Sequence, residues 1–314
     1  MTTTRRPYII AISLLAVLDI AAGFWYFANH VNADGHSGGL LWDNGADSEA
    51  MMADTLASTV ASNRFEPVTD RMACYTSAFT LPTGNGKGEP YTCIKQVKLR
   101  MPKAVNGSTE LGGLRQAIAD KAFNRTGESL GKAVNAFVEA AEFNLGGNSD
   151  YAQSPSVTTR SVVGREHRVK AYPYSTSERL LQYEVYGYVY DGYRRSERMG
   201  YVLYDRALHR VLGMADVFRP SESGRLLKFI NSRIAKVARK KGQELNAATT
   251  VAAEFRVEQR GISMVYAEGA IATPESGVSF VFLPYSELDP CLTDEFKRLL
   301  AGDCGYHRYK PMKF

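Results

Sequence analysis

Residues 8–27 form an apolar run at the N-terminus that is long enough to cross a membrane (YIIAISLLAVLDIAAGFWYF). At about 1.5 Å of rise per residue, such a helix spans roughly 30 Å, the thickness of one hydrocarbon core. Arg5 and Arg6 precede the run, and positive charge before a first apolar segment keeps that end in the cytosol. We therefore expect residues 1–31 to form an N-terminal signal anchor, with the bulk of the chain outside the membrane.

A cleaved signal peptide is the alternative interpretation of the same run. Residues 31–33 (Val-Asn-Ala) could serve as its cleavage site. However, the run is longer than a typical signal-peptide core, and the aromatic residues 24–27 at its outer end match a membrane-interface belt. We favour the anchor, which predicts a single-pass protein whose larger part is extracytoplasmic.

The chain after residue 31 has the composition of a globular protein. Charged residues make up 23% and hydrophobic residues 45% of the whole chain, which is ordinary for a packed domain. A net charge of +5 is mild, and the expected location argues against nucleic acid as a partner. We predict a linker at 32–64, an N-terminal α+β subdomain at 65–150 and a C-terminal α+β subdomain at 151–314.

Strand and helix patterns alternate along these two subdomains. Strand groups are indicated by alternating apolar residues between Gly- and Pro-rich turns, at 71–101, 183–213 and 253–283. Helices are indicated by apolar residues at helical spacing, at 108–123, 128–143, 220–241 and 286–302. The predicted fold class is therefore α+β, with antiparallel sheets packed by helices and preceded by one N-terminal transmembrane helix.

Four cysteines fit an oxidising compartment and form two pairs that are local in sequence. Cys74 and Cys93 lie on the two strands of the first predicted hairpin, so a bridge between them is the simplest pairing. Cys291 begins the last predicted helix and Cys304 follows its end, so a second bridge is feasible but tight. A zinc site is the alternative. The spacings match no Cys-x-x-Cys pattern, and disulfides are favoured.

The sequence contains no familiar catalytic or metal-binding motif. The five histidines form neither H-x-x-x-H nor H-E-x-x-H, and there is no G-x-S-x-G or phosphate-loop motif. The glycine-rich stretch 84–88 lies between two predicted strands and is interpreted as a hairpin turn. We expect no catalytic residues, no metal and no cofactor, although the paired carboxylates of a glycosidase need not lie close in sequence.

A stripe of tyrosines followed by two arginines is the strongest candidate for a ligand-binding surface. The candidate residues are Tyr186, Tyr188, Tyr190, Tyr193, Arg194 and Arg195. Tyrosines that alternate along one strand can bind glycan or peptide by stacking. More often such a stripe is the half-buried face of a sheet beneath a helix, and a charged turn is a solvated tip.

Two stretches of the sequence resemble a known family. In 201–218, a strand ending in Tyr-Asp leads through a short turn and strand to Asp-Val-Phe before a helix. In 255–288, the residues that match the family pattern follow in order: Gly261, Ile262, Tyr266, Ala270, Ala272, Gly277, Pro284, Tyr285 and Leu288. Together the two stretches resemble the extracytoplasmic domain of RsiV-type anti-sigma factors, a domain of unknown function also found in envelope lipoproteins and beside a peptidoglycan deacetylase.

The resemblance covers about 65–300 in outline and implies an α+β fold that binds at the bacterial cell envelope, in one case to lysozyme. The sequence departs from the family at 191–196, where many relatives carry a Gly-Gly-Ala-His-Gly-like turn. The residues before the apolar run are too few to fold around a sigma factor, and no deacetylase domain is expected. These departures argue against an anti-sigma or deacetylase role.

We therefore expect a non-catalytic binding or sensory module of the bacterial inner membrane, single-pass and mainly periplasmic. Its expected partners are the membrane, through the N-terminal helix, and a lysozyme-like protein or peptidoglycan. Two alternatives remain. One is an envelope hydrolase acting on peptidoglycan, and the other is a structural tether to another membrane protein, which Asp19 within the apolar run weakly favours.

Overall fold

The computed structural model describes residues 60–81, 89–139, 151–154, 162–190, 194–241 and 244–314. These residues, apart from Lys313, belong to one compact unit. The predicted anchor at 1–31, most of the predicted linker at 32–64 and the glycine-rich stretch 84–88 lie outside the described residues. None of the helices in the described part of the chain is both long and apolar enough to cross a membrane.

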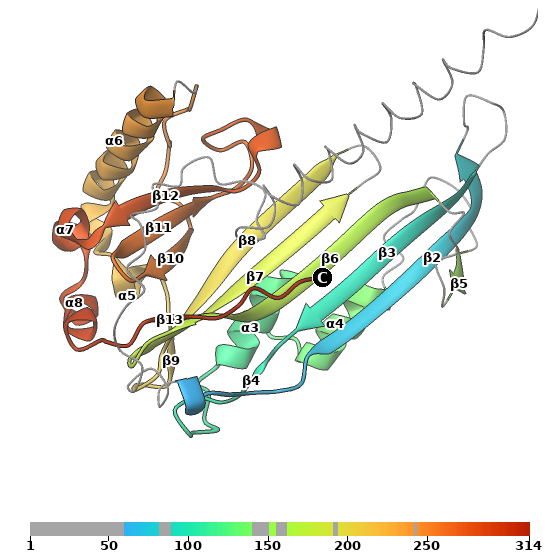
Figure 1. The fold of residues 1–314 in the computed structure, drawn as a ribbon, viewed down its shortest axis with the longest axis horizontal. Coiled ribbons are helices and arrows are strands. Elements are labelled where there is room, and N and C mark those ends of the chain that lie inside the picture. The colour runs from blue at the N-terminus through green and yellow to red at the C-terminus, as the bar shows by residue number, and fades with distance from the viewer. Residues whose placement is uncertain (1–59, 82–88, 140–150, 155–161, 191–193, 242–243) are drawn as a thin grey trace, which may run out of the picture. The chain divides into compact units, whose positions relative to one another are not determined.

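A sheet of eight strands forms the centre of this unit (Figure 1). Its strands follow the order β5-β2-β3-β6-β7-β8-β9, and β13 pairs with the end of β6. The bounds are β2 (Thr69–Leu81), β3 (Glu89–Leu99), β5 (Tyr151–Ser154), β6 (Val162–Thr176), β7 (Leu180–Tyr190), β8 (Arg195–Asp205), β9 (Arg210–Leu212) and β13 (His307–Arg308). The predicted subdomain boundary at residue 150 thus falls between strands of one sheet.

A second, smaller sheet and the helices complete the fold. The small sheet is antiparallel and contains β10 (Glu254–Glu258), β11 (Gly261–Tyr266) and β12 (Ser279–Pro284). A short pair joins β1 (Arg64–Phe65) to β4 (Pro102–Ala104). The α-helices are α3 (Leu114–Phe123), α4 (Leu130–Glu139), α5 (Met214–Val217), α6 (Ser223–Lys241), α7 (Tyr285–Leu288) and α8 (Asp294–Ala301). These elements confirm the α+β class.

The large sheet is mixed, so the expectation that the sheets are all antiparallel is wrong. β3 and β6 run parallel along Tyr91–Leu99 and Val162–Ala171, whereas the other strand pairs of this sheet are antiparallel. Parallel neighbours cannot be joined by a tight turn and need a crossover connection. Here the connection from β3 to β6 contains α3 and α4, which explains why helices interrupt the strand pattern between them.

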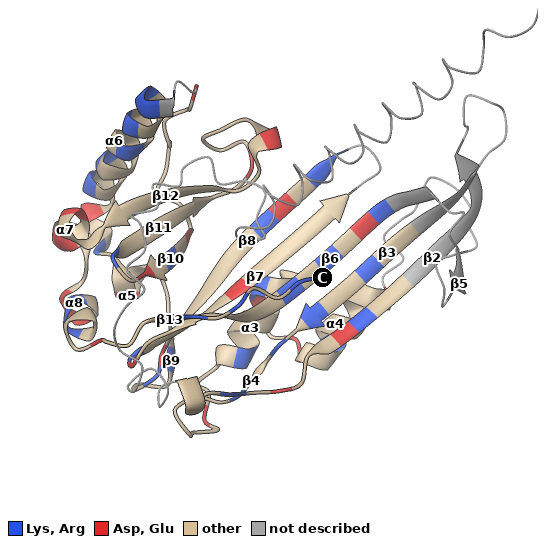
Figure 2. Cartoon of the chain, viewed as in Figure 1, with Lys and Arg blue, Asp and Glu red and all other residues tan. Residues whose placement is uncertain are grey.

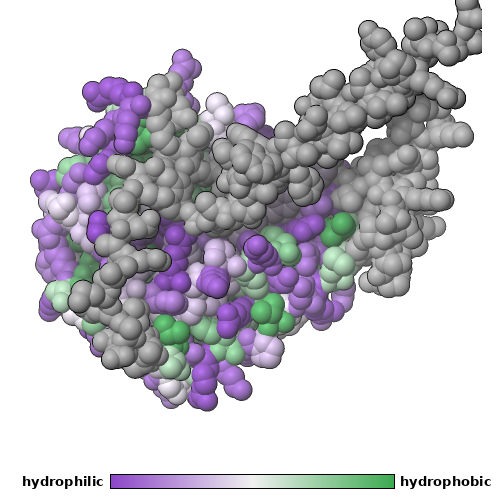
Figure 3. All heavy atoms as spheres, in the orientation of Figure 1, coloured by the Kyte–Doolittle hydropathy of each residue, from purple (hydrophilic) through white to green (hydrophobic). Residues whose placement is uncertain are grey.

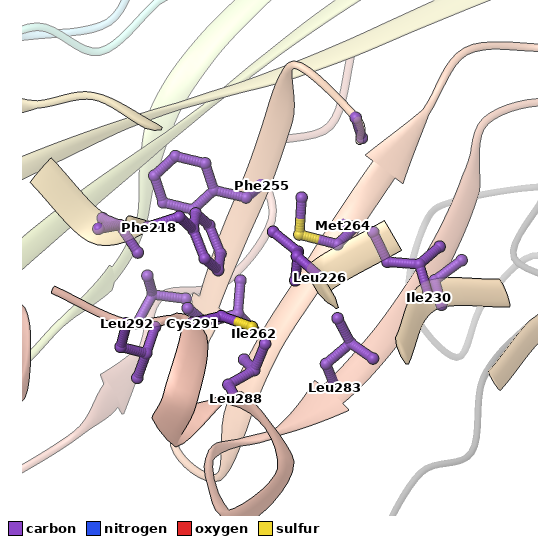
Figure 4. Close-up of a cluster of buried hydrophobic side chains, with 14 of the residues drawn as sticks. Phe218, Leu226, Ile230, Phe255, Ile262, Met264, Leu283, Leu288, Cys291 and Leu292 are labelled. Atoms are coloured by element: carbon purple, nitrogen blue, oxygen red, sulfur yellow. The ribbon is translucent and has the colours of Figure 1, made fainter. Parts of the chain in front are cut away.

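The two faces of the large sheet bury different layers. On one face, side chains of α3 and α4 such as Ile118 and Val134 share a core with strand residues such as Val169. On the other face, Leu180 and Leu203 share a core with α6 and the small sheet. Figure 4 shows part of this second core, in which Leu226 and Ile230 of α6 lie near Ile262 and Met264 of β11. The central strands are thus covered on both faces.

The last predicted helix, at 286–302, is divided in the structure into α7, a 3-10 turn (Asp289–Cys291) and α8. The Thr293 hydroxyl accepts a hydrogen bond from the Phe296 backbone N–H at 3.1 Å, which fixes the start of α8. Cys291 therefore lies in a turn, where it is buried, and Cys304 is exposed. Both carry free thiols, so the predicted 291–304 bridge is absent from the structure.

The register of the first hairpin also bears on the predicted bridge between Cys74 and Cys93. β2 and β3 pair as predicted, but Cys93 is opposite Tyr75, and Cys74 is opposite Ile94. Directly opposed residues share a face, and successive residues on a strand alternate between faces. This register therefore does not place the two cysteines as an opposed pair.

The helix predicted at 108–123 begins only at Leu114, because two glycines in left-handed conformations precede it. Gly112 has φ +47° and Gly113 has φ +80°. A Cβ atom built on Gly112 would lie 1.5 Å from the carbonyl oxygen of His209. Position 112 therefore requires glycine, both for its backbone conformation and for the close approach of the chain before β9.

We expect Gly112→Ala to destabilise the protein by more than about 2 kcal/mol, because the clash with backbone cannot relax without moving the turn. Gly131 in α4 is a matched control, since a Cβ there would meet nothing within 4 Å. Gly131→Ala should leave stability unchanged or raise it by up to about 1 kcal/mol. Urea unfolding of the two variants checks this, and equal effects would contradict it.

Candidate functional site

The tyrosine stripe lies on β7, but the C-terminal residues, rather than a helix, contact its inner member. Tyr186 is half-buried, and its ring lies 4.8 Å from the Lys170 ammonium and 6.1 Å from the Phe314 ring. The Lys170 ammonium also donates to the Met312 carbonyl at 3.0 Å. Burial raises the pKa of Tyr186 well above its usual value. Tyr186 is therefore packed against a cation and an aromatic ring of its own chain. The C-terminal end of the chain lies over β6 and β7 (Figure 1).

The outer members of the predicted surface gather where β7 ends and β8 begins. Tyr188 and Tyr190 are partly exposed, and Arg194 and Arg195 are exposed. Tyr190 is opposite Arg195 in the strand register. We call these four residues the Tyr–Arg end. Figure 2 shows the Lys and Arg residues at this end of β8.

Tyr193 lies outside the described residues. Arg194 is 62% exposed and its guanidinium lies 4.0 Å from the Glu268 carboxylate, a contact that is worth little when exposed to water. The position of Arg194 therefore leaves it accessible to a partner.

A cavity of about 380 Å³ lies at the other end of β7, where no sequence motif predicts a site. Its walls come from the β6–β7 turn, β7, β8, β10, α7 and the chain around α8. Residues of β7 are spaced by about 3.3 Å, so Leu180 in the cavity wall and Tyr190 at the Tyr–Arg end are roughly 33 Å apart. The cavity and the Tyr–Arg end are therefore separate places on the molecule.

One buried amide joins the two sheets beside the cavity. The Gln182 side chain donates to the Val257 carbonyl at 3.2 Å and accepts from the Val257 backbone N–H at 2.8 Å. Both groups would be costly to bury without partners. The paired amide therefore fixes β10 against β7, and both residues line the cavity.

A buried ion pair holds the carboxylate of Glu258 at the cavity wall. Arg256 is 1% exposed and donates through Nε and Nη2 to Glu258 Oε1 at 3.1 and 2.8 Å. Its guanidinium also lies 4.6 Å from the Phe280 ring and 5.3 Å from the Tyr174 ring. The Ser263 hydroxyl donates to the same carboxylate oxygen. Glu258 thus compensates a charge that water cannot reach.

The second carboxylate of the cavity, Asp303, is less well compensated. Burial raises the pKa of Asp303, although the Ser177 hydroxyl and the Arg179 backbone N–H, at 2.9 Å, bond to its carboxyl group. The neighbouring Cys304 thiol donates to Glu178 Oε2 at 2.7 Å, and this hydrogen bond raises the pKa of the thiol. The cavity wall therefore contains a carboxyl group that is costly to ionise and a protonated thiol.

A third carboxylate, Glu184, is fully buried between the sheets. It accepts hydrogen bonds from the hydroxyl groups of Tyr172 and Tyr201. Burial raises the pKa of both tyrosines, which keeps them protonated as donors. Glu184 does not line the cavity, and its role in the geometry is to satisfy the buried tyrosine hydroxyls.

These groups limit the chemistry that the cavity can perform. Glu258 and Asp303 give it two acidic residues, and hydrolysis of a glycoside by general acid–base catalysis uses a pair of carboxyl groups. Among the residues that the structure describes, no three His, Cys, Asp or Glu side chains are grouped as they would be around a metal ion. The sequence could not reveal this pair, because the two acids lie in separate elements and in no motif.

Comparison with known proteins gives a fold but no activity. No family model matches the sequence, and no curated protein matches it. A DUF3298 family member from Bacteroides fragilis has a TM-score of 0.51 and 13% identity over 74% of this chain and 96% of its own. The chain shares its fold with this protein.

A second structural neighbour is a DUF3298 family protein from Pseudomonas aeruginosa, with a TM-score of 0.48 and 14% identity. It covers 73% of this chain and 95% of its own. The Bacteroides fragilis protein supports the expectation of a domain of unknown function. At such low identity the likeness concerns the fold and not the site.

We expect Glu258→Gln to destabilise the protein by about 3 kcal/mol, because it leaves the buried Arg256 charge without an opposite charge. Glu287 is a matched control, since its pair with Arg233, at 2.6 Å, is at the surface with the Glu287 side chain 43% exposed. Glu287→Gln should cost less than about 1 kcal/mol. Chemical unfolding measures both, and similar costs would show that the Arg256 charge does not depend on Glu258.

We expect Asp303→Asn to make stability less dependent on pH. A raised pKa means that the folded protein holds the Asp303 proton over a range where the unfolded chain, with a pKa near 3.8, has lost it. The free energy of unfolding therefore falls as pH rises through this range and stays lower above it. Asparagine removes this penalty, so the variant should be at least as stable as the parent near neutral pH.

The measurement is urea unfolding of parent and variant from about pH 4 to about pH 7. The control is Asp289→Asn, because the Asp289 side chain is 68% exposed and pairs with Lys297 at the surface. Its profile should run parallel to that of the parent. A difference between Asp303→Asn and the parent that does not change with pH would contradict the prediction.

Proposed function

We propose that the protein is a membrane-anchored, extracytoplasmic binding or sensory module of the bacterial cell envelope. It acts without catalysis and is held in the inner membrane by one N-terminal helix at 1–31, with its bulk in the periplasm. The apolar run and the arginines before it support this location. The resemblance to RsiV-type domains supports a role of this kind, and the fold shared with a DUF3298 protein agrees with an α+β domain.

The observation that carries the proposal is the Tyr–Arg end. Tyrosine and arginine are enriched in protein interfaces and among the residues that dominate binding energy. Here Tyr190 is opposite Arg195 in the register of β7 and β8, Tyr188 lies two positions earlier on β7, and Arg194 directly precedes β8. The tyrosines are partly exposed and the arginines exposed. Such a surface presents rigid aromatic rings and the guanidinium donors of arginine to a partner. Binding there would leave the core of the large sheet unchanged.

The distribution of the large exposed hydrophobic side chains favours a polar recognition surface over a broad apolar one. Among the described residues they are scattered, at Val68, Met72, Val189 and Leu208. Val189 follows Tyr188 on β7 and therefore points to the opposite face of the sheet. On the face drawn in Figure 3, hydrophobic residues form small separate patches among hydrophilic ones. Recognition would thus rest on tyrosine rings and arginine hydrogen bonds, which suit a lysozyme-like protein or a cell-wall glycan.

The experiment is a calorimetric titration of the full chain, in detergent micelles, with lysozyme and with soluble peptidoglycan fragments. We expect saturable binding without product formation. Replacing both Arg194 and Arg195 by Ala should weaken it at least about tenfold. The control replaces Lys236 and Arg239 on α6, which are also exposed, and should bind like the parent.

Undiminished binding by the Arg194/Arg195 variant would reject this surface, and failure to bind either ligand would reject the proposed partners. Release of glycan fragments would instead favour an envelope hydrolase, for which Glu258 and Asp303 in one cavity are the supporting observation. In that case Asp303→Asn should abolish product formation while the Arg194/Arg195 variant retains it.

A further inference from the structure

The cavity at the β6–β7 turn is a second candidate site that does not depend on the Tyr–Arg end. We propose that it binds an alkyl cation: the ammonium or guanidinium group of a lysine or arginine side chain, or a free alkylamine of the same chemistry. The proposal goes beyond envelope binding through the Tyr–Arg end, and it rests on the charge, the hydrogen-bonding capacity and the shape of the cavity.

The charge of the lining selects a cation. Among the described residues that form the walls, Glu258 and Asp303 are acidic, and none is Lys, Arg or His. Arg256 lies behind the wall and is turned to Glu258 Oε1. Glu258 already has an opposite charge in Arg256, but Asp303 is costly to ionise. An anionic ligand would raise that cost, whereas a cation would relieve it.

Two donors of the wall are already engaged, while its carboxyl groups can accept further hydrogen bonds. Tyr285 has used its hydroxyl hydrogen on the Glu258 carbonyl, at 3.0 Å, and Cys304 has used its thiol hydrogen on Glu178. The three hydrogen bonds to the Glu258 carboxylate all fall on Oε1. A carboxylate offers about four lone-pair sites, so both acids can still accept from a ligand, and an ammonium or guanidinium group supplies only donors.

The remaining walls fit the stem that carries such a charge. Leu180, Leu203, Val257 and Leu300 provide apolar surface, and the tyrosines 285 and 306 provide rings that attract a cation. A volume of about 380 Å³ lies within the range of small-molecule sites. Cys304 is an exposed member of the wall, so the cavity opens to solvent at this position.

The test uses the full chain in detergent micelles and saturation-transfer NMR, which detects weak ligands. The probes are Nα-acetyl-lysine methylamide, its uncharged analogue Nα-acetyl-norleucine methylamide, and cadaverine. We expect the lysine derivative to bind and the norleucine derivative not to bind. Binding of cadaverine at equal or higher affinity would identify a free amine as the ligand, and weaker binding would identify a side chain.

Asp303→Asn should weaken binding of the lysine derivative at least about tenfold, because a charged hydrogen bond is lost. Since this variant is expected to be no less stable near neutral pH, the loss could not come from unfolding. Asp289→Asn is the control and should bind like the parent. Equal binding of the norleucine derivative, or undiminished binding by Asp303→Asn, would overturn the proposal.

Cys304 provides a second readout that locates the ligand. N-ethylmaleimide modification of Cys304, followed by mass spectrometry of the peptide that contains it, should be slowed by the lysine derivative in the parent and not in Asp303→Asn. Binding without protection of Cys304 would place the ligand elsewhere and overturn the assignment to this cavity. The Arg194/Arg195 variant should retain protection, which separates this site from the proposed partner surface.

Discussion

The pairing of one side-chain amide with one backbone amide determines how the two sheets meet. Gln182 satisfies both the N–H and the carbonyl of Val257, as a neighbouring strand would. A buried backbone group without a partner costs free energy comparable to a lost hydrogen bond. The contact therefore sets the position of β10 over β7, and with it the core around α6 and the cavity between the sheets.

Acidic side chains extend this junction along the exposed edge of the large sheet. β8 is paired with β9 only over its last residues, which leaves backbone N–H groups of its earlier part without a strand partner. Glu254 accepts from the Tyr201 backbone N–H at 3.1 Å and is itself held by Lys121 at 2.6 Å. Glu268 accepts from the Glu197 backbone N–H. These contacts protect an edge that could otherwise pair with another chain.

The sequence predicted the elements whose apolar residues follow a regular period and missed those in which charge breaks that period. α6 and β10–β12 were predicted within a few residues. β6 was not predicted, because its charged residues and Pro173 obscure a strand pattern. Lys170 is nevertheless buried, because the rings of Tyr186 and Phe314 lie close to its ammonium group. Pro173 is tolerated in the strand because it lies beside a register shift. Missing this strand concealed the parallel pairing with β3.

The two candidate sites also differ in whether the sequence could predict them. The Tyr–Arg end could be found from sequence because its residues are consecutive on one hairpin, and strand alternation alone brings them together. The cavity could not be found, because Gln182, Glu258 and Asp303 come from distant segments and belong to no motif. Its acids also have structural partners, Arg256 for Glu258 and Arg179 for Asp303. A site made by the junction of two sheets depends on the position of β10, which only the buried Gln182 contact defines.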